Sequence, residues 1–225
     1  MLNHPHPLET LTLTISPVYR GFKPDSHDTV PWFDRLGFAD SRRAWRRRQA
    51  SFDPARLIFL DESGAKTNLT RLRGRAPRGQ RVHAKTPQGH WNTTTMIGSI
   101  RLDGSTACMT IDGAADTEVF QAYVRSVLCP TLRAGDVVIM DNLSPHKSEP
   151  TLSLMAQAGA QILFLPAYSP DLNPIEKMWS KVKTCLRSAE ARTEATLIQA
   201  IGSALQSVTR QDAINWFASC GYSFV

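Results

Sequence analysis

Two short apolar runs, each followed at once by an aspartate, constrain most strongly how this chain can fold. Residues 57–60 are followed by Asp61, and residues 137–140 are followed by Asp141. An unbroken apolar run of this length is typical of a strand buried on both faces of a sheet. A single aspartate beside such a strand is often a helix cap or a turn former. Two of them favour a functional role, since on neighbouring strands the carboxylates would lie side by side.

The segments around these runs predict the rest of an α/β fold. Residues 93–100 and 106–112 read as two strands, joined by Asp103-Gly104, which is a good hairpin signal. A further strand is predicted at residues 161–165, and helices are predicted at residues 116–132, 150–158, 174–188, 193–208 and 211–218. This order predicts a mixed β-sheet of about five strands with helices on both faces.

The first 50 residues differ in character from the rest. Five prolines within residues 1–40 preclude several regular helices, so we expect a poorly ordered arm with one short strand at residues 11–15. A predicted short basic helix follows, forming either a solvated face or a phosphate-contacting strip; its arginines are Arg42, Arg43, Arg46, Arg47 and Arg48. We therefore expect an N-terminal arm and basic linker, partly disordered, at residues 1–50 and one domain at residues 51–225.

Positive charge indicates the kind of partner. The chain has 225 residues and a net charge of +6, and residues 66–85 contain seven Lys/Arg and no acid. Glycine and proline punctuate this segment as turns. A polyanion, above all nucleic acid, fits such a distribution. We predict a DNA-facing hairpin that carries Arg71, Arg73, Arg75, Arg78 and Arg81.

Cysteine usage and hydropathy restrict the location of the protein. The four cysteines are far apart and form no CxxC pair, which argues against a disulfide framework or a thiolate zinc site. No apolar run approaches the roughly 20 residues of a membrane helix, and the N-terminus lacks the features of a secretory signal. We expect a cytoplasmic protein without a membrane partner.

A proline-rich stretch delivers a third acid. Residues 165–176, LPAYSPDLNPIE, limit the conformations of the chain and place Glu176 in the first turn of a predicted helix, where the helix dipole favours an anion. The 34 residues between Asp141 and Glu176 suffice for a helix, a strand and a returning loop. Together with Asp61 these carboxylates suit a two-metal site for phosphoryl transfer, with Mg2+ or its substitute Mn2+. The pattern favours a nuclease or strand transferase.

The same motifs resemble the catalytic domain of mariner-like DDE transposases. The likeness is carried by LDES (60–63), VVIMDNLSPHKS (137–148) and YSPDLNPIEKMWSKVK (168–183), covers about residues 51–220, and is greatest for the branch carried by bacterial insertion sequences. It implies a ribonuclease-H-like fold, a two-Mg2+ site, cleavage at transposon ends and strand transfer into target DNA, typically at TA dinucleotides. It also implies a catalytic triad of Asp61, Asp141 and Glu176, and double-stranded DNA bound by a homodimer.

The chain departs from the family at its N-terminus. Family members carry a helix-turn-helix region that reads the terminal inverted repeats, and the prolines of residues 1–40 preclude such a module there. We expect a separated or truncated catalytic half that works at the nucleoid with a separate helix-turn-helix half. The alternatives are an inactive or domesticated transposase-derived DNA-binding protein, which the three intact acids disfavour, and another ribonuclease-H-like nuclease, which the SPDLNPIE run disfavours.

Residues beside Asp61 and Asp141 are weaker candidates for the functional site. Glu62 follows Asp61 directly and would point to the opposite face of a strand, so it is a poorer candidate ligand. His146 and Lys147 follow the second strand and are candidate DNA contacts. His146 could alternatively orient a metal-bound water or bond its own loop.

Residues around the third acid have mainly structural expectations. Asp171 and Asn173 should form turn hydrogen bonds within the proline-rich loop. Trp179 lies three residues after Glu176, at helical spacing, and is expected to pack in the core rather than stack on a base.

Overall fold

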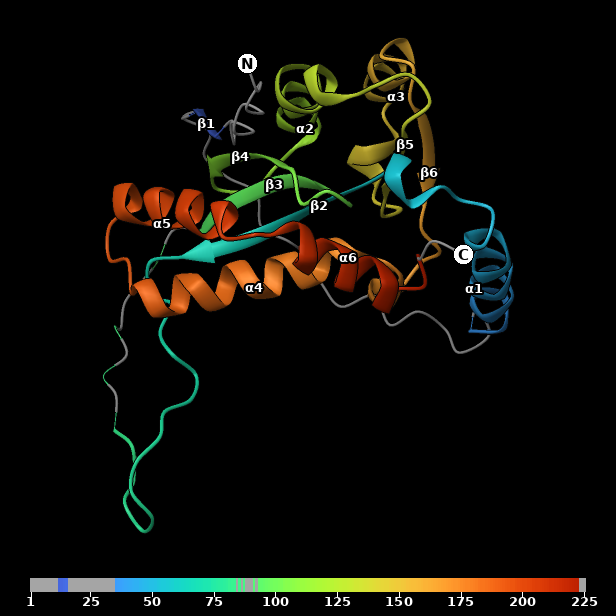
Figure 1. Cartoon of the computed structure of the whole chain (residues 1–225). Coiled ribbons are helices and arrows are strands. Elements are labelled where there is room, and N and C mark those ends of the chain that lie inside the picture. The colour runs from blue at the N-terminus through green and yellow to red at the C-terminus, as the bar shows by residue number, and fades with distance from the viewer. Residues whose placement is uncertain are drawn as a thin grey trace, which may run out of the picture.

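Six strands form the centre of the protein, in a computed structural model that describes residues 12–15, 35–83, 85, 87, 91 and 93–222 (Figure 1). Five of them were expected in the sheet: β2 (Leu57–Lys66), β3 (Thr93–Arg101), β4 (Thr106–Asp112), β5 (Val137–Met140) and β6 (Gln161–Phe164). The sixth, β1 (Thr12–Ile15), is the short strand expected in the N-terminal arm, and it joins the sheet at its edge by pairing with β4. The strand order is β1-β4-β3-β2-β5-β6.

The sheet is mixed, as predicted. Strands β2, β3 and β4 are antiparallel neighbours, whereas β5 and β6 run parallel to β2. The predicted hairpin turn at Asp103-Gly104 joins β3 to β4, and Gly104 has a φ of +86° that favours glycine. Parallel neighbours need crossover connections, which helices α2 (Thr117–Tyr123) and α3 (Glu149–Gln157) provide before β5 and β6.

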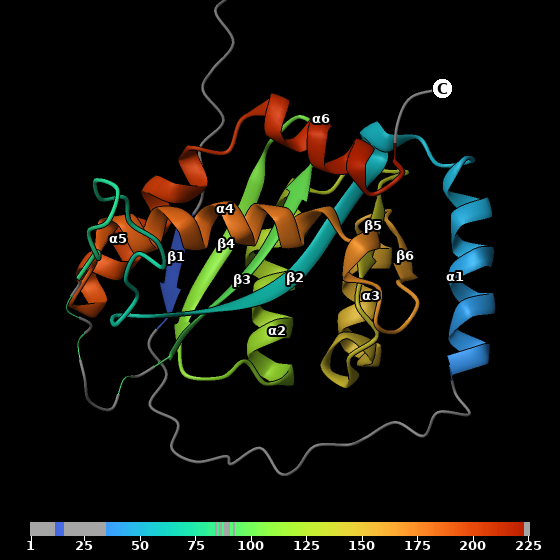
Figure 2. The same cartoon turned by 90° about the horizontal axis from the view of Figure 1, so that it is seen from below.

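Helices cover both faces of the sheet (Figure 2). On β2, Leu57 and Phe59 join one apolar cluster, and Ile58 and Leu60 join the other, which confirms a strand buried on both sides. The first cluster packs beneath α4 (Pro174–Ala189), α5 (Glu194–Gln206) and α6 (Arg210–Ser219), and the second beneath α2 and α3. In the described part of the chain, no helix is long and apolar enough to cross a membrane.

Two predicted elements differ in extent. Strand β2 does not end at its acids but continues to Lys66, because β3 pairs with it along this whole length, with Gly98 opposite Asp61. The helix predicted at 116–132 begins as expected, with the Asp116 carboxylate accepting from the Val119 amide, but α2 ends at Tyr123. A π turn and a 3-10 turn complete the segment, and Pro130, which cannot donate to a helix, lies in the latter.

The basic segment before residue 50 belongs to the folded structure. Helix α1 (Arg35–Gln49) lies beside the C-terminal end of the described chain (Figure 1). Its Trp45 is 7% exposed and donates to the Tyr222 hydroxyl at 2.9 Å, and its Gln49 side chain donates to the Cys220 carbonyl. The predicted basic helix is therefore attached to the domain through a largely buried anchor, Trp45.

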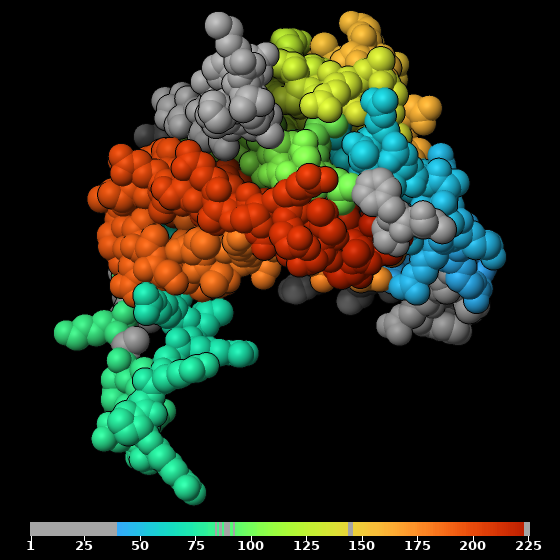
Figure 3. Space-filling view, in the orientation of Figure 1, coloured from blue at the N-terminus to red at the C-terminus, as the bar shows by residue number. Residues whose placement is uncertain are grey.

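The predicted basic hairpin is a long projecting loop. Residues 67–83 leave the end of β2, extend away from the domain and contain no strand in their described part (Figures 1 and 3). The two limbs approach each other where a Cβ at Gly74 would lie 2.7 Å from Val82 Cγ1. The guanidinium of Arg192 anchors the base of the loop by donating to the carbonyls of Thr67 and Leu69.

A glycine sets how closely α4 approaches the sheet. Trp179 is 2% exposed, which confirms its predicted place in the core. A Cβ at Gly98 would lie only 2.8 Å from Cη2 of this indole, well inside van der Waals contact. Since Gly98 pairs with Asp61, and Trp179 follows Glu176 by one turn of helix, this contact also fixes the spacing between two of the predicted acids.

We expect Gly98→Ala to lower the free energy of unfolding by roughly 1–3 kcal/mol, because a buried indole must move aside. Gly202→Ala is the matched control: nothing lies within 4 Å of that position in α5, and alanine there should be neutral or stabilise by about 0.5–1 kcal/mol. Urea denaturation measures both. Equal stability of the two variants would contradict the close packing of α4 on β3.

Candidate active site

The register of β2 against β5 brings the first two acids together. The strands run parallel, with Phe59 opposite Ile139. Two residues further along the same register, Asp141 falls beside Asp61, on the same side of the sheet because side chains alternate along a strand. Strand β5 ends at Met140 while β2 continues to Lys66, so Asp141 is the first residue of a loop. The pairing of β5 with β2 therefore stops short of Asp61.

All three predicted acids line one cleft of about 400 Å³. Asp61 lies on β2, Asp141 follows β5, and Glu176 is in the first turn of α4. The loop after β5 and the proline-rich loop (residues 165–173) form the remaining walls. A larger cavity of about 540 Å³ beside the β3–β4 turn contains none of these acids. Arg101, which lines that cavity, is paired with the buried carboxylate of Asp136, to which it donates a hydrogen bond of 2.6 Å. The three predicted acids therefore lie together in the smaller cleft.

The position of Asp61 in the cleft raises the pKa of its carboxyl. Burial raises the pKa of its carboxyl, and the charges of Glu176, Asp141 and Glu62 raise it further, to about 7. The backbone amide of Glu62, which donates to Asp61 Oδ1 at 2.8 Å, opposes this rise. The like charges of the cleft therefore disfavour full ionisation near neutral pH unless a cation neutralises them.

The proline-rich loop does not use its polar side chains as predicted. Asn173 caps α4 by position, but its Nδ2 donates to Asp61 Oδ2 at 3.2 Å instead of bonding within the turn. Asp171 likewise turns outward, and its two oxygens accept from Arg42 of α1 at 2.8 and 2.7 Å. Both side chains thus have partners more than 100 positions away in the sequence, in addition to the turn hydrogen bonds that the Asn173 backbone makes within the loop. Asn173 is thus a residue of the cleft. Its position before α4 suggests a helix cap and does not indicate its contact with Asp61.

His146 lies beneath the cleft and not on its surface. Its side chain is 0% exposed and its ring lies against Phe120, with centroids 4.3 Å apart. Nε2 is 3.1 Å from Glu62 Oε1, and Nδ1 is 2.7 Å from Asp141 Oδ1, although that second contact is poorly aligned for a hydrogen bond. The predicted DNA contact by His146 does not fit this burial. The ring instead joins Glu62, on the far side of β2, to the loop of the second acid.

The side chains present fit a hard divalent cation. Asp61, Asp141 and Glu176 offer carboxylate oxygens, and Asn173 Oδ1 is buried without a hydrogen-bond partner among the described residues. Oxygen ligands of this kind suit Mg2+, and a cation would offset the burial and relieve the repulsion that together raise the pKa of Asp61. Within the described ranges, no three His, Cys, Asp or Glu side chains are drawn together closely enough to hold an ion as they stand.

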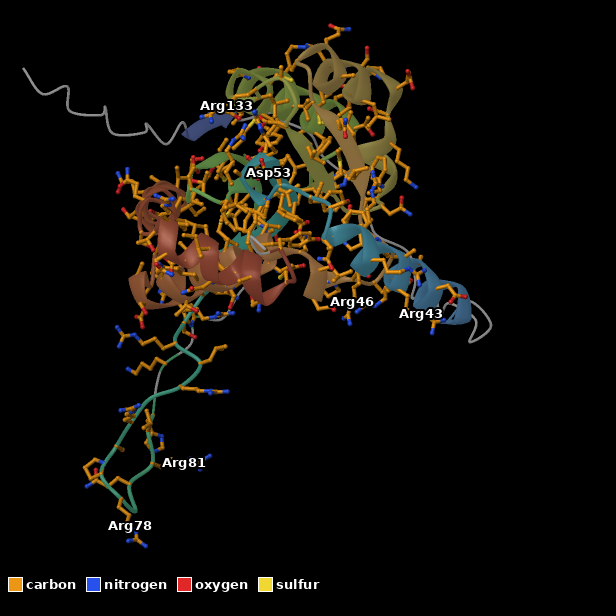
Figure 4. The ribbon with its side chains drawn as sticks, turned by 45° about the vertical axis from the view of Figure 1, so that its right-hand side comes forward. Arg43, Arg46, Asp53, Arg78, Arg81 and Arg133 are labelled. Atoms are coloured by element: carbon orange, nitrogen blue, oxygen red, sulfur yellow. The ribbon has the colours of Figure 1, made fainter. Side chains whose placement is uncertain are left out.

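The predicted DNA-contacting residues lie outside the cleft. The five arginines of the projecting loop are exposed, and Figure 4 shows Arg78 and Arg81 near its tip. Lys147 is exposed beside the cleft loop, with its ammonium 5.9 Å from the centre of the Phe164 ring. The structure therefore separates the acids from the main basic segment.

Because His146 is buried, its removal should lower stability. We expect His146→Ala to reduce the free energy of unfolding by about 3 kcal/mol, through the cavity left against Phe120 and the loss of a partner for Glu62. Lys147→Ala, at the adjacent exposed position, should change it by less than about 0.5 kcal/mol. Chemical denaturation of the two variants provides the comparison, and a His146→Ala protein as stable as wild type would contradict the buried role.

The raised pKa of Asp61 predicts a pH-dependent stability. Between about pH 4, near the pKa of an unfolded aspartate, and about pH 7, the folded state retains a proton that the unfolded chain releases. Stability of metal-free protein should therefore fall as pH rises through this window. Asp61→Asn should raise the free energy of unfolding by about 4 kcal/mol at pH 8 and by less than about half of that at pH 5. Denaturation in EDTA at both pH values tests this; an equal gain at both would refute the shifted pKa.

Two curated proteins resemble the chain in sequence. The chain is 28% identical over 169 residues to the Tcb1 transposase of Caenorhabditis briggsae, matching 67% of this chain and 60% of that protein. It is 39% identical over 57 residues to human histone-lysine N-methyltransferase SETMAR, matching 25% of this chain and 8% of that protein. The chain thus spans less than two thirds of the length of either curated relative.

Solved structures share the fold. The Mos1 strand transfer complex superposes with a TM-score of 0.57 at 14% identity, over 93% of this chain and 68% of that chain. The mariner Mos1 paired end complex with Mg gives 0.53 at 14% identity, over 92% and 68%. These likenesses confirm the predicted ribonuclease-H-like α/β fold. The family model for the DDE superfamily endonuclease matches residues 56–198, more than half of the chain. The chain therefore belongs to the DDE superfamily endonucleases.

Proposed function

We propose that the chain is the catalytic part of a DNA transposase, which cleaves phosphodiester bonds at transposon ends and transfers the strands into target DNA. The observation that carries the proposal is the parallel register of β2 and β5, which sets Asp61 beside Asp141 in the cleft that Glu176 also lines. The likeness to the Tcb1 transposase over 169 residues supports the assignment to transposition. The Asp-Asn strand end and the SPDLNPIE run support the mariner-like branch of bacterial insertion sequences.

In this proposal Asp61, Asp141 and Glu176 hold Mg2+, with Mn2+ as a substitute. The donor set and the repulsion at Asp61 support a divalent cation, and a mariner relative with this fold was solved with Mg. The chemistry supplied by bound metal is activation of an attacking water or 3′-hydroxyl and stabilisation of the leaving oxygen. The chain's own part is to orient the carboxylates. Asn173 holds Asp61 through Nδ2, and His146 fixes the loop of Asp141 from below.

The proposed partner is double-stranded DNA, both transposon end and target. The exposed loop arginines, Arg71, Arg73, Arg75, Arg78 and Arg81, would contact the phosphate backbone together with Lys147. Such contacts position DNA without reading its sequence and weaken steeply with salt. We therefore propose a separate helix-turn-helix half for end recognition, a homodimer in the DNA complex, and action at the bacterial nucleoid. The domain that acts there would include residues 51–225 and, given its anchoring, α1.

The alternatives receive less support. A domesticated DNA-binding protein would not need three acids around one cleft. Another ribonuclease-H-like nuclease would share the fold, but the sequence relative that covers most of the chain is a transposase.

The decisive experiment is a cleavage assay with purified protein, its helix-turn-helix partner, DNA bearing the terminal repeats, and Mg2+ or Mn2+. Asp61→Ala, Asp141→Ala and Glu176→Gln should each lower the cleavage rate by roughly 10³-fold, because each removes a proposed metal ligand. Glu118→Gln is the matched control, since Glu118 also occupies the first turn of a helix but lies outside the cleft. It should cut at the wild-type rate.

Two results would count against the proposal. If wild type never cuts in the presence of its partner and metal, the enzymatic function fails. If cutting survives Asp141→Ala, the assignment of the site is wrong even though the protein is a nuclease.

A further inference from the structure

Helix α1 contacts the turn that delivers the third acid. Arg42 donates to both carboxylate oxygens of Asp171, at 2.8 and 2.7 Å, and to Ser169 Oγ at 2.8 Å. Arg46 adds a longer contact of 3.3 Å to Asp171. Such a forked, two-point pair fixes direction as well as distance. The Asp171 carboxylate is held in its charged form, because the hydrogen bond from Arg42 lowers its pKa.

A second and buried connection reaches the same turn. Trp45 Nε1 donates to the Tyr222 hydroxyl at 2.9 Å, and that hydroxyl donates to the Leu172 carbonyl, also at 2.9 Å. Tyr222 is 2% exposed, so water competes little for these bonds. An exposed ion pair and a buried hydrogen-bond chain thus run from α1 to adjacent residues of the turn.

Displacement of this turn would be transmitted to the cleft. Three successive hydrogen bonds connect it to α4: the amides of Leu172, Asn173 and Glu176 donate to the carbonyls of Ser169, Pro170 and Asn173. The next side chain, Asn173, holds Asp61.

The backbone just before the turn is under strain. Tyr168 has a φ of +53°, which an aromatic residue adopts only when its surroundings enforce it. Its carbonyl lies 3.4 Å from Arg42 Nη1, and its ring is 70% exposed at the wall of the cleft. The contact with Arg42 is part of the surroundings that hold this conformation.

We propose that α1 is an integral part of the catalytic unit and that Arg42 is a positioning residue, which acts through Asp171 and Ser169 to hold Asn173 and Glu176 in place. This rests on the proposed function only for its effect on catalysis. The helix lies outside residues 56–198, where the family model matches, so the family assignment does not itself predict the contact.

The first test needs no activity. Hydrogen–deuterium exchange of the full chain should show amides in residues 169–176 exchanging roughly two- to fivefold faster in Arg42→Ala, since an exposed ion pair of this kind contributes up to about a fivefold factor. Residues 194–206 of α5 should be unchanged. Asp171→Asn, a nearly isosteric change at an exposed position, should give the same pattern.

Arg43→Ala is the matched control for charge. Arg43 is the adjacent arginine on α1, pairs with Asp40 of the same helix and is labelled in Figure 4. It should leave exchange in residues 169–176 as in wild type. Wild-type exchange there in both Arg42→Ala and Asp171→Asn would overturn the proposal, whatever the protein does to DNA.

The second test distinguishes a role of Arg42 in positioning catalytic groups from a purely structural role. In the cleavage assay, Arg42→Ala should lower kcat at saturating DNA by about 10–100-fold, because a small misplacement of a catalytic group has effects of that size. Arg42→Lys should recover part of the loss, since lysine supplies the charge but not the forked geometry. Arg43→Ala should alter KM at most. If the exchange changes but kcat does not, or if Arg42→Ala and Arg43→Ala lose activity equally, Arg42 is not a positioning residue.

Discussion

The parallel pairing of β2 with β5 is the constraint on which the rest of the structure depends. A slip of one residue would set Asp141 beside Glu62 or Leu60 and turn it away from Asp61, because side chains alternate between faces. Two apolar clusters, one on each side of the sheet, oppose such a slip, since every residue from 57 to 60 is buried. The strands thereby hold two carboxylates together although burial, with the added repulsion of the neighbouring acids, raises the pKa of Asp61 to about 7.

Three further contacts position the acids of the cleft from different directions. His146 contacts the Asp141 side chain from the α2 face and is itself held by Glu62. The adjacent acids Asp61 and Glu62 thus serve opposite faces of one strand. Asn173 contacts Asp61 from the proline-rich loop. On the α4 face, the absence of a side chain at Gly98 lets α4 lie close, which sets how far Glu176 stands from the sheet.

Local patterns in the sequence were enough to predict the main elements, and long-range partners were not. Apolar runs and turn signals predicted five strands and the helices after them, because burial determines these patterns. The motifs around Asp61, Asp141 and Glu176 indicated the family. The extent of β2 beyond Asp61 depends on pairing with β3, which no local signal contains. Arg42 and Asp171 are 129 residues apart, so a bond between them cannot be deduced from either neighbourhood, and both were assigned other roles.

The acids of the cleft and the arginines of the projecting loop lie in different parts of the chain, which bears on how DNA would be bound and cleaved. A cleft lined by three acids repels phosphate until a cation is present, so it cannot supply the initial attraction. The basic loop can, but it leaves the sheet at the far end of β2, toward the C-terminal end of α4, while Glu176 lies in the first turn of that helix (Figure 1). Capture and chemistry would therefore depend on different parts of the chain. Changes in loop charge should then alter affinity and its salt dependence, whereas changes around Asp61 should alter the rate of the chemical step.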